Sequence, residues 1–194
     1  MSNEIPQWNE SGVLPPISES SPTSAYRSPY KTTTVELVNR YTLNKRRADI
    51  LSGFLRFRSR LYDIGMIDGF QWIDGSFTEN IELIESRKPN DIDVVTFFDV
   101  PEGETQNSLV QKASDLFLPD FADWRKDTFM TDAYWQPLGV SPNLLVERTV
   151  YWYSMWAHKR DLSWKGFLQV PLSPQDDIQA KIILDDLISG GFYE

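Results

Sequence analysis

Two strand-like runs, each carrying a short polar motif at one end, constrain this chain more than any other feature. The first run, residues 70–74, passes directly into Gly75 and Ser76. Fourteen residues later, Asp91 and Asp93 open a second run that is strongly apolar. Side chains alternate across a strand, so these two aspartates share one face. Because adjacent carboxylates repel each other unless a cation lies between them, the pattern predicts a cation site at the tip of a buried strand.

The rest of the chain predicts an α+β fold, in which helices flank a small mixed β-sheet. Helical patterns cover about 42–65, 105–118, 141–158 and 174–189, and strand patterns cover 70–74, 91–100, 129–135 and 164–172. Residues 34–194 are long enough for one domain. Residues 1–33 are rich in Ser, Pro and Thr, and we expect an extended or partly disordered N-terminal arm. Within it, residues 12–16 are more apolar and could dock onto the domain.

Composition excludes several classes of protein. The net charge of −9 argues against a protein that coats nucleic acid electrostatically. With no Cys there is no disulfide framework and no thiolate zinc site. No apolar run reaches the length of a membrane span, and the N-terminus has no apolar signal core, so we expect a cytoplasmic protein that does not bind membranes.

The predicted helix 42–65 holds much of the positive charge. It carries six cations, Lys45, Arg46, Arg47, Arg56, Arg58 and Arg60, against Asp49 and Asp63, which is six minus two or a local charge of +4. Lys45 and Arg56 fall opposite the apolar stripe, and Arg60 falls beside it. One interpretation is a solvated outer face. The other is a surface for RNA or for an acidic partner.

The Gly-Ser pair and a third carboxylate complete the candidate site. Gly75 would let the backbone approach a ligand closely, and Ser76 offers a hydroxyl. If a helix begins there, its free N–H groups favour an anion. Transfer chemistry with two metal ions commonly needs a third carboxylate. Asp132 lies in a strand-like segment and Glu147 on a predicted helix, so we choose Asp132.

These motifs resemble a known superfamily. Trp72-Ile-Asp-Gly-Ser-Phe-Thr and Pro89-Asn-Asp-Ile-Asp-Val-Val are similar to the nucleotidyltransferase superfamily of the DNA polymerase β type. More closely, the chain resembles a group of small bacterial nucleotidyltransferase-like proteins. Those proteins share a Leu-Pro-Pro segment, here residues 14–16, an arginine-bearing helix before the Gly-Ser strand, and a late Lys-Gly element, here at Lys165. The resemblance covers most of residues 12–188.

The resemblance implies an activity and a set of site residues. Such enzymes transfer a nucleoside monophosphate from an NTP to a hydroxyl or phosphate acceptor. Asp91 and Asp93 would bind Mg²⁺ or Mn²⁺, with Asp132 as third ligand, and Gly75 and Ser76 would contact phosphate. For the charge that develops on pyrophosphate, our candidate cations are Lys165 and Arg160, with Lys88 behind them.

One departure from the family pattern concerns the segment between the two motifs. It is longer than in minimal members of the superfamily and carries Glu79, Glu82 and Glu85. These acids repel an incoming triphosphate unless they face away from the site. The single histidine, His158, follows a predicted helix end, where a structural role is the simpler interpretation. The aromatic cluster around Trp152 predicts helix packing, with nucleobase stacking as the alternative.

Several functions remain open from the sequence. The acceptor could be tRNA, another protein or a small molecule, and related bacterial enzymes suggest a toxin role with a partner antitoxin, or phage defence. A second hypothesis is a catalytically inactive nucleotidyltransferase fold that acts as a binding or regulatory protein. A third is a metal-dependent phosphatase or nuclease, whose chemistry does not need the Gly-Ser turn.

Overall fold

A computed structural model of the chain describes residues 4–18 and 20–192. The predicted arm, residues 1–33, therefore includes four positions, 1–3 and 19, that lie outside the described residues. The centre of the fold is a five-stranded sheet with the order β1-β5-β2-β3-β4. Its strands are β1 (Tyr30–Lys31), β2 (Gly69–Asp74), β3 (Ile92–Phe98), β4 (Thr131–Pro137) and β5 (Leu168–Pro171). Strand β2 is antiparallel to both neighbours, whereas the outer pairs β1–β5 and β3–β4 are parallel. The predicted α+β class with a mixed sheet is confirmed.

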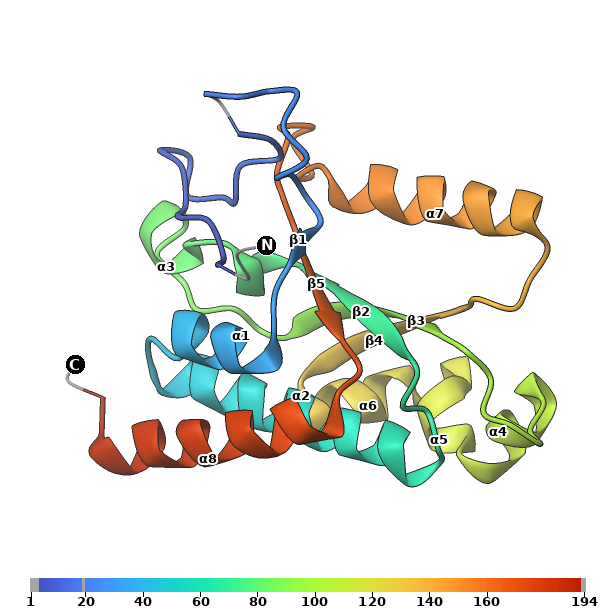
Figure 1. The fold of residues 1–194 in the computed structure, drawn as a ribbon. Helices are drawn as coiled ribbons and strands as arrows, with labels where there is room; N and C mark the ends of the chain where they lie inside the picture. The colour runs from blue at the N-terminus through green and yellow to red at the C-terminus, as the bar shows by residue number, and fades with distance from the viewer. Residues whose placement is uncertain (1–3, 19, 193–194) are drawn as a thin grey trace.

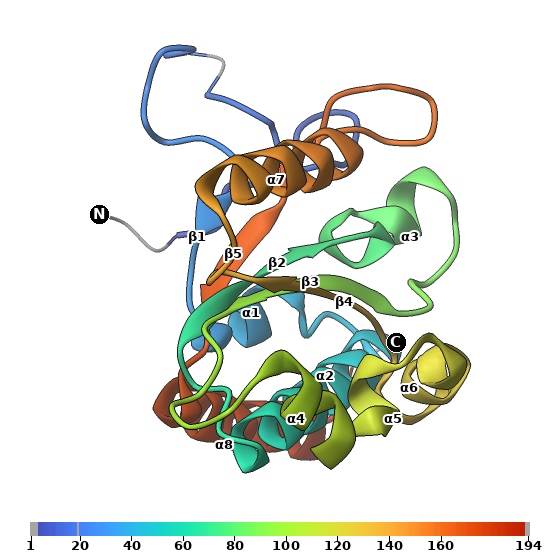
Figure 2. The same cartoon turned by 90° about the vertical axis from the view of Figure 1, so that its right-hand side faces the viewer.

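Helices lie on both faces of this sheet (Figure 1). They are α1 (Thr34–Tyr41), α2 (Lys45–Asp63), α3 (Ile81–Ile84), α4 (Gln106–Lys112), α5 (Ser114–Phe117), α6 (Ala122–Phe129), α7 (Pro142–Trp156) and α8 (Pro174–Gly190), with short 3₁₀ turns η1 (Ser76–Thr78) and η2 (Pro119–Phe121). Figure 2 shows α1, α2, α4–α6 and α8 beneath the sheet, α7 above it and α3 beyond the end of β2. We call the first of these the closed face and the second the open face.

The observed helix boundaries show where local signals were sufficient. Helix α2 begins after Asn44, whose side chain accepts a hydrogen bond from the Arg47 amide, and Gly65 follows its end with a φ of +85°. The continuous helix predicted for 105–118 is wrong, because the backbone leaves the helical region at Ala113, with a φ of −142° and a ψ of 57°. Helices α1 and α6 were not predicted.

The closed face holds most of the core. The predicted apolar stripe of α2 is confirmed, since Ile50, Phe54 and Phe57 are fully buried. Gly53 interrupts this stripe for a packing reason. A Cβ at that position would lie 2.2 Å from the Phe129 carbonyl oxygen, so α2 approaches the end of α6 more closely than any other residue would allow.

Two arginines of α2 fall outside both interpretations of its basic charge. Arg47 and Arg58 are completely buried, so they belong neither to a solvated face nor to a surface for a partner. Arg47 donates to the carbonyl oxygens of Phe77 and Glu79, both at 2.6 Å, and thereby fixes the chain that follows the Gly-Ser turn. Lys45, in contrast, points outward with a side chain that is 76% exposed.

The apolar patch of the N-terminal arm docks as expected. Val13 and Leu14 are buried, and the amide of Gly166 donates to the Leu14 carbonyl oxygen at 2.7 Å. A Cβ at Gly166 would lie 2.6 Å from the Pro15 carbonyl oxygen, so the Lys-Gly element fits directly against this patch. The end of the predicted arm also supplies β1, which pairs with β5.

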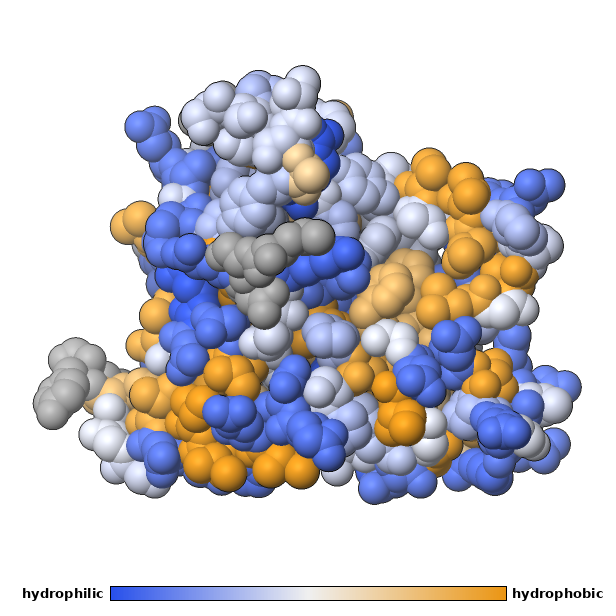
Figure 3. Space-filling model, viewed as in Figure 1, coloured by the Kyte–Doolittle hydropathy of each residue, from blue (hydrophilic) through white to orange (hydrophobic). Residues whose placement is uncertain are grey.

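Apolar side chains are also exposed on two helices. Helix α7 buries only Trp156, while Val146 and Val150 are more than half exposed. Helix α8 likewise exposes Ile178 and Ile182. Figure 3 shows apolar surface over both helices, at the upper right and lower left. Within the described residues, none of the helices combines the length and apolar character needed to cross a membrane.

Candidate functional site

Three aspartates form a row across the open face. Asp74 is the register partner of Asp93 on the antiparallel pair β2–β3, and Asp93 is the register partner of Asp132 on the parallel pair β3–β4. Neighbouring strands lie about 4.8 Å apart, so three carboxylates are stacked side by side. Asp91 directly precedes β3, two residues before Asp93, on the same side of the chain.

A cleft of about 750 Å³ opens over this row. All seven predicted site residues line it, namely Gly75, Ser76, Asp91, Asp93, Asp132, Arg160 and Lys165. The remaining charged residues of its wall are Asp74, Glu79, Glu85, Arg87, Lys126, His158, Lys159 and Asp161. With histidine neutral, seven acids stand against five bases, which leaves a net charge of −2. The cleft is therefore rich in both signs of charge within an acidic protein.

Gly75 allows the aspartate row and the Gly-Ser turn to approach each other closely. Its φ of +84° lies in the region that favours glycine, and a Cβ here would lie only 1.8 Å from Asp93 Oδ2. The Asp93 carboxylate thus rests directly on the Gly75 backbone. After it, Ser76 begins η1, which is only three residues long. The helix that we considered after the Gly-Ser pair is this single turn, too short for a helix dipole to attract an anion.

Asp93 stands at the centre of the row without a partner. No hydrogen bond or ion pair joins its side chain to another described residue, although most of the carboxyl is shielded from water. Burial, followed by the charges of Asp91, Asp74 and Asp132, raises the pKa of Asp93 to about 7, and only Lys126 opposes them. The centre of the cleft is short of positive charge.

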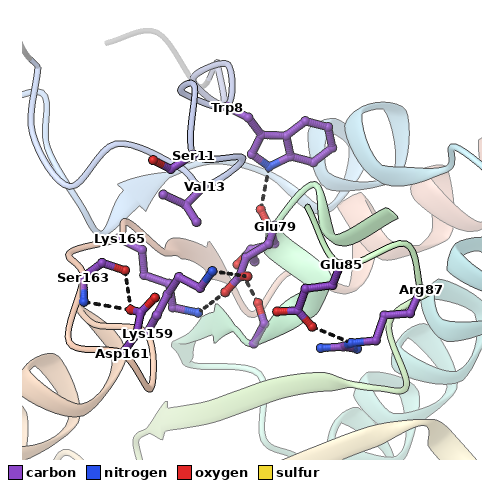
Figure 4. A network of polar contacts seen from close by, with 12 residues as sticks. Trp8, Ser11, Val13, Glu79, Glu85, Arg87, Lys159, Asp161, Ser163 and Lys165 are labelled. Atoms are coloured by element: carbon purple, nitrogen blue, oxygen red, sulfur yellow. Dashed lines mark hydrogen bonds and ion pairs between the residues drawn. The ribbon is translucent and has the colours of Figure 1, made fainter. Parts of the chain in front are cut away.

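Asp74 is paired at one end of the row. Lys165 Nζ lies 3.0 Å from Asp74 Oδ1 and 2.9 Å from Glu79 Oε1, and Figure 4 shows Lys159 and Lys165 both directed at Glu79. All three members of this triad are buried. Burial outweighs the attraction of Lys165 and raises the pKa of Asp74 to about 6. No role was predicted for Asp74, although this residue directly precedes the Gly-Ser pair.

Lys126 occupies the other end of the row and was missed entirely. Its Nζ lies 2.7 Å from Asp132 Oδ2 and 3.1 Å from Asp91 Oδ2. Burial acts to lower the pKa of Lys126, but its bonds to Asp132 and Asp91 outweigh that effect and raise the pKa above its usual range. Lys126 belongs to α6, a helix without an apolar stripe in its sequence, so no pattern marked it.

The three glutamates between the motifs do not leave free negative charge in the cleft. Glu79 is held by Lys165, as described above. Glu82 accepts from Arg47 Nε at 2.7 Å, and Glu85 accepts from Arg87 Nε at 2.7 Å at the cleft wall. Each of these three glutamates, which could otherwise repel a triphosphate, is thus paired with a cation of the same chain.

Two other candidates lie away from the cleft. Lys88 is exposed and is not part of the wall, where Arg87 and Lys159 lie instead. Glu147, the alternative third carboxylate, is exposed on α7.

His158 does line the cleft, and its Nδ1 lies 3.0 Å from the Ser154 carbonyl oxygen. Its ring packs on Trp164, with 4.4 Å between centroids. These contacts agree with a structural role for His158.

The donor set of the cleft suits a hard divalent cation. Carboxylate oxygens are the ligands that Mg²⁺ and Mn²⁺ prefer, and the cleft offers Asp91, Asp93 and Asp132 together. In the described parts of the chain, no group of three or more His, Asp or Glu side chains is already drawn together around one point in the manner of a formed metal site. At the place where Asp91 and Asp132 converge, the nearest cation is the Lys126 ammonium.

The chain belongs to a family of unknown function, DUF6932, whose family model matches residues 6–171. No curated protein and no solved structure matches the chain. The matched region contains every residue of the cleft described above, whereas helix α8 lies beyond it.

Proposed function

We propose that this member of DUF6932 is a metal-dependent nucleotidyltransferase, which moves a nucleoside monophosphate from an NTP to a hydroxyl or phosphate acceptor. One observation carries the proposal above the others. The Asp93 carboxylate lies between Asp74 and Asp132, without a hydrogen bond or ion pair to any described residue. A fold keeps such an arrangement only at a cost, which a bound cation removes.

Asp91, Asp93 and Asp132 would hold this cation. When bound, a divalent ion would offset the negative charge of the nucleotide phosphates and lower the pKa of the acceptor hydroxyl. The parallel register of β3 and β4 fixes Asp93 and Asp132 beside each other on rigid strands, which keeps their separation constant during turnover. The pKa of about 7 for Asp93 means that deprotonation and cation binding occur together near neutral pH.

The phosphates would meet the Gly-Ser turn and the cationic wall. Gly75 has no side chain to keep a phosphate from the backbone, and the Ser76 hydroxyl can donate to it. Arg160 is exposed on the wall, and the Lys159 side chain is 23% exposed. We assign Lys165 a different task from these two, because its ammonium is already bound to Asp74 and Glu79. Through these two ion pairs Lys165 would position the Gly-Ser turn, and it would contribute positive charge to the site without contacting the phosphates itself.

The size and charge of the cleft agree with this substrate class. A volume of about 750 Å³ falls within the range of sites that enclose a nucleotide-sized ligand. The wall has a charge of −2, so cations must accompany a triphosphate into the site. An acceptor hydroxyl on RNA, protein or a small molecule would approach from the open side of the cleft. The proposal includes a toxin or phage-defence role, whose nature would depend on which acceptor is modified.

Calorimetry with each of ATP, CTP, GTP and UTP in Mg²⁺ tests the proposal. We expect binding of at least one nucleotide by the wild-type protein and its loss in an Asp91→Asn, Asp93→Asn double variant. Incubation with α-labelled nucleotide and cell extract then identifies the acceptor. If no nucleotide binds with or without Mg²⁺, the proposal fails, and the alternative of an inactive nucleotidyltransferase fold that serves as a binding module takes its place.

A further inference from the structure

Each end of the aspartate row is bridged by a lysine, but the two bridges differ in exposure. The Lys165 side chain is 6% exposed, and its partners Asp74 and Glu79 are 6% and 7% exposed. The Lys126 side chain is 41% exposed, and its partners Asp91 and Asp132 are 21% and 25% exposed. A buried bridge cannot open without leaving bare charges in the protein interior. The Lys126 bridge is partly solvated and can open at little cost.

Lys126 also has room to leave. A second cavity of about 330 Å³ adjoins the cleft, lined by Arg46, Asn90, Asp91, Lys126, Asp127 and Met130. Lys126 and Asp91 belong to the walls of both cavities. The flexible four-carbon stem of lysine lets the ammonium turn from the cleft toward this second cavity, where the Asp127 carboxylate also lies. The α6 backbone need not move for this change.

The ammonium and a divalent cation compete for the same oxygens. Lys126 Nζ contacts Asp132 Oδ2 and Asp91 Oδ2, two of the three carboxylates that we assign to the metal. An ammonium and a divalent cation at the same two oxygens repel each other strongly, so the binding of one weakens the binding of the other. Asp93, the third carboxylate, makes no ion pair within the described part of the chain, so it stays available as the first contact for an incoming ion.

We propose that Lys126 is an exchangeable counter-cation, whose ammonium holds Asp91 and Asp132 in the cation-free protein and leaves them when a divalent ion binds. The inference rests on the proposed metal-dependent function and names the residue that the metal displaces. The exchange keeps the carboxylates correctly spaced before the metal arrives. The released ammonium remains beside the cleft, within reach of the second cavity and of an incoming phosphate.

Titration calorimetry with Mn²⁺ alone, without nucleotide, tests the exchange. Lys126→Met removes the competing charge but keeps the length of the side chain, so it should bind Mn²⁺ roughly tenfold more tightly than the wild type, since two partly exposed ion pairs no longer have to be broken. Lys126→Gln should show the same direction. Lys126→Arg keeps the charge and should gain no affinity. Lys181→Met, which breaks an exposed pair with Asp185 on α8, is the matched control and should leave Mn²⁺ affinity unchanged.

A second readout is the melting temperature, measured without metal and with Mn²⁺. In EDTA the Lys126→Met protein should melt at a lower temperature than the wild type, because its carboxylates have lost their counter-charge, and Mn²⁺ should raise its melting temperature by more. Equal or weaker Mn²⁺ binding by Lys126→Met and Lys126→Gln, while the wild type binds, overturns the exchange and leaves the proposed function standing. Absence of Mn²⁺ binding in the wild type and in every variant overturns both.

Discussion

The two faces of strand β2 differ in how completely their charged side chains are paired. On the closed face, Asp177 accepts hydrogen bonds from Arg58, Tyr62 and Thr34, each at 3.0 Å or less. Arg58 also donates to Gln71 of β2 at 2.6 Å, so this buried network has a partner for each charge. On the open face, three residues further along β2, Asp74 begins a row whose central carboxylate makes no hydrogen bond or ion pair with a described residue.

This difference separates a stabilising network from a functional one. Burial of a matched pair is tolerated because each charge satisfies the other, and removal of one member exposes the full cost of desolvating the other. In the open row the carboxylates destabilise each other, and burial keeps that repulsion strong. A substitution that removes one charge should therefore destabilise the closed face, whereas removal of the unpaired central charge of Asp93 should stabilise the open face.

The largest effect should come from the closed face. Arg58→Ala leaves Asp177 buried without a counter-charge, and we expect the free energy of unfolding to fall by about 3–5 kcal/mol. Urea denaturation measures this change. The matched control is Lys45→Ala, which breaks an exposed pair with Asp49 and should cost below about 1 kcal/mol. A similar small loss for Arg58→Ala would remove the contrast between the faces.

The Gly-Ser turn should show the next largest effect. Gly75→Ala places a methyl group against Asp93 Oδ2 and strains a φ of +84°, so we expect a loss of about 2–3 kcal/mol. Gly103→Ala has a similar φ of +80° but meets no atom within 4 Å, so it gives the cost of a positive φ without a steric contact, about 1 kcal/mol. Equal unfolding free energies for the two variants would show that the Asp93 contact carries no strain.

The open row predicts a change of the opposite sign. Asp93→Asn removes the central charge, and we expect the metal-free protein to gain about 1 kcal/mol, which raises the melting temperature by about 2–4 °C. The same variant should lose nucleotide transfer by at least about 10²-fold. A variant that is less stable than the wild type in EDTA would show that Asp93 has a structural partner.

The smallest of these effects should be the dependence of stability on pH. The pKa values of Asp93 and Asp74 are about 7 and about 6, both above the usual 3.8 of an aspartate. Between about pH 4 and pH 7 the folded state therefore binds more protons than the unfolded state, so these groups make stability fall as pH rises. Thermal melts in EDTA at pH 5 and pH 7.5 measure the trend. Mn²⁺ should stabilise the protein more at pH 7.5, where the carboxylates are charged.

Much of the site could be predicted from local patterns, because strands make register simple. Asp91 and Asp93 share a face by alternation, and Asp132 meets them because β4 pairs in register with β3. The parts that escaped prediction depend on distant charges. Arginine is rarely buried, so Arg47 and Arg58 were simply counted with the other cations of their predicted helix, and their burial depends on partners distant in the sequence such as Glu82 and Asp177. Lys126 was missed because nothing in α6 marks which side faces the sheet.

The most direct measurement is an anomalous difference map from a crystal of the wild-type protein grown with Mn²⁺ at pH 7.5. We expect a manganese peak bound by the Asp93 carboxylate, with Asp91 and Asp132 as neighbouring ligands and the Lys126 ammonium turned away. A fully loaded crystal with no peak at Asp93, or with manganese only elsewhere on the protein, would contradict it.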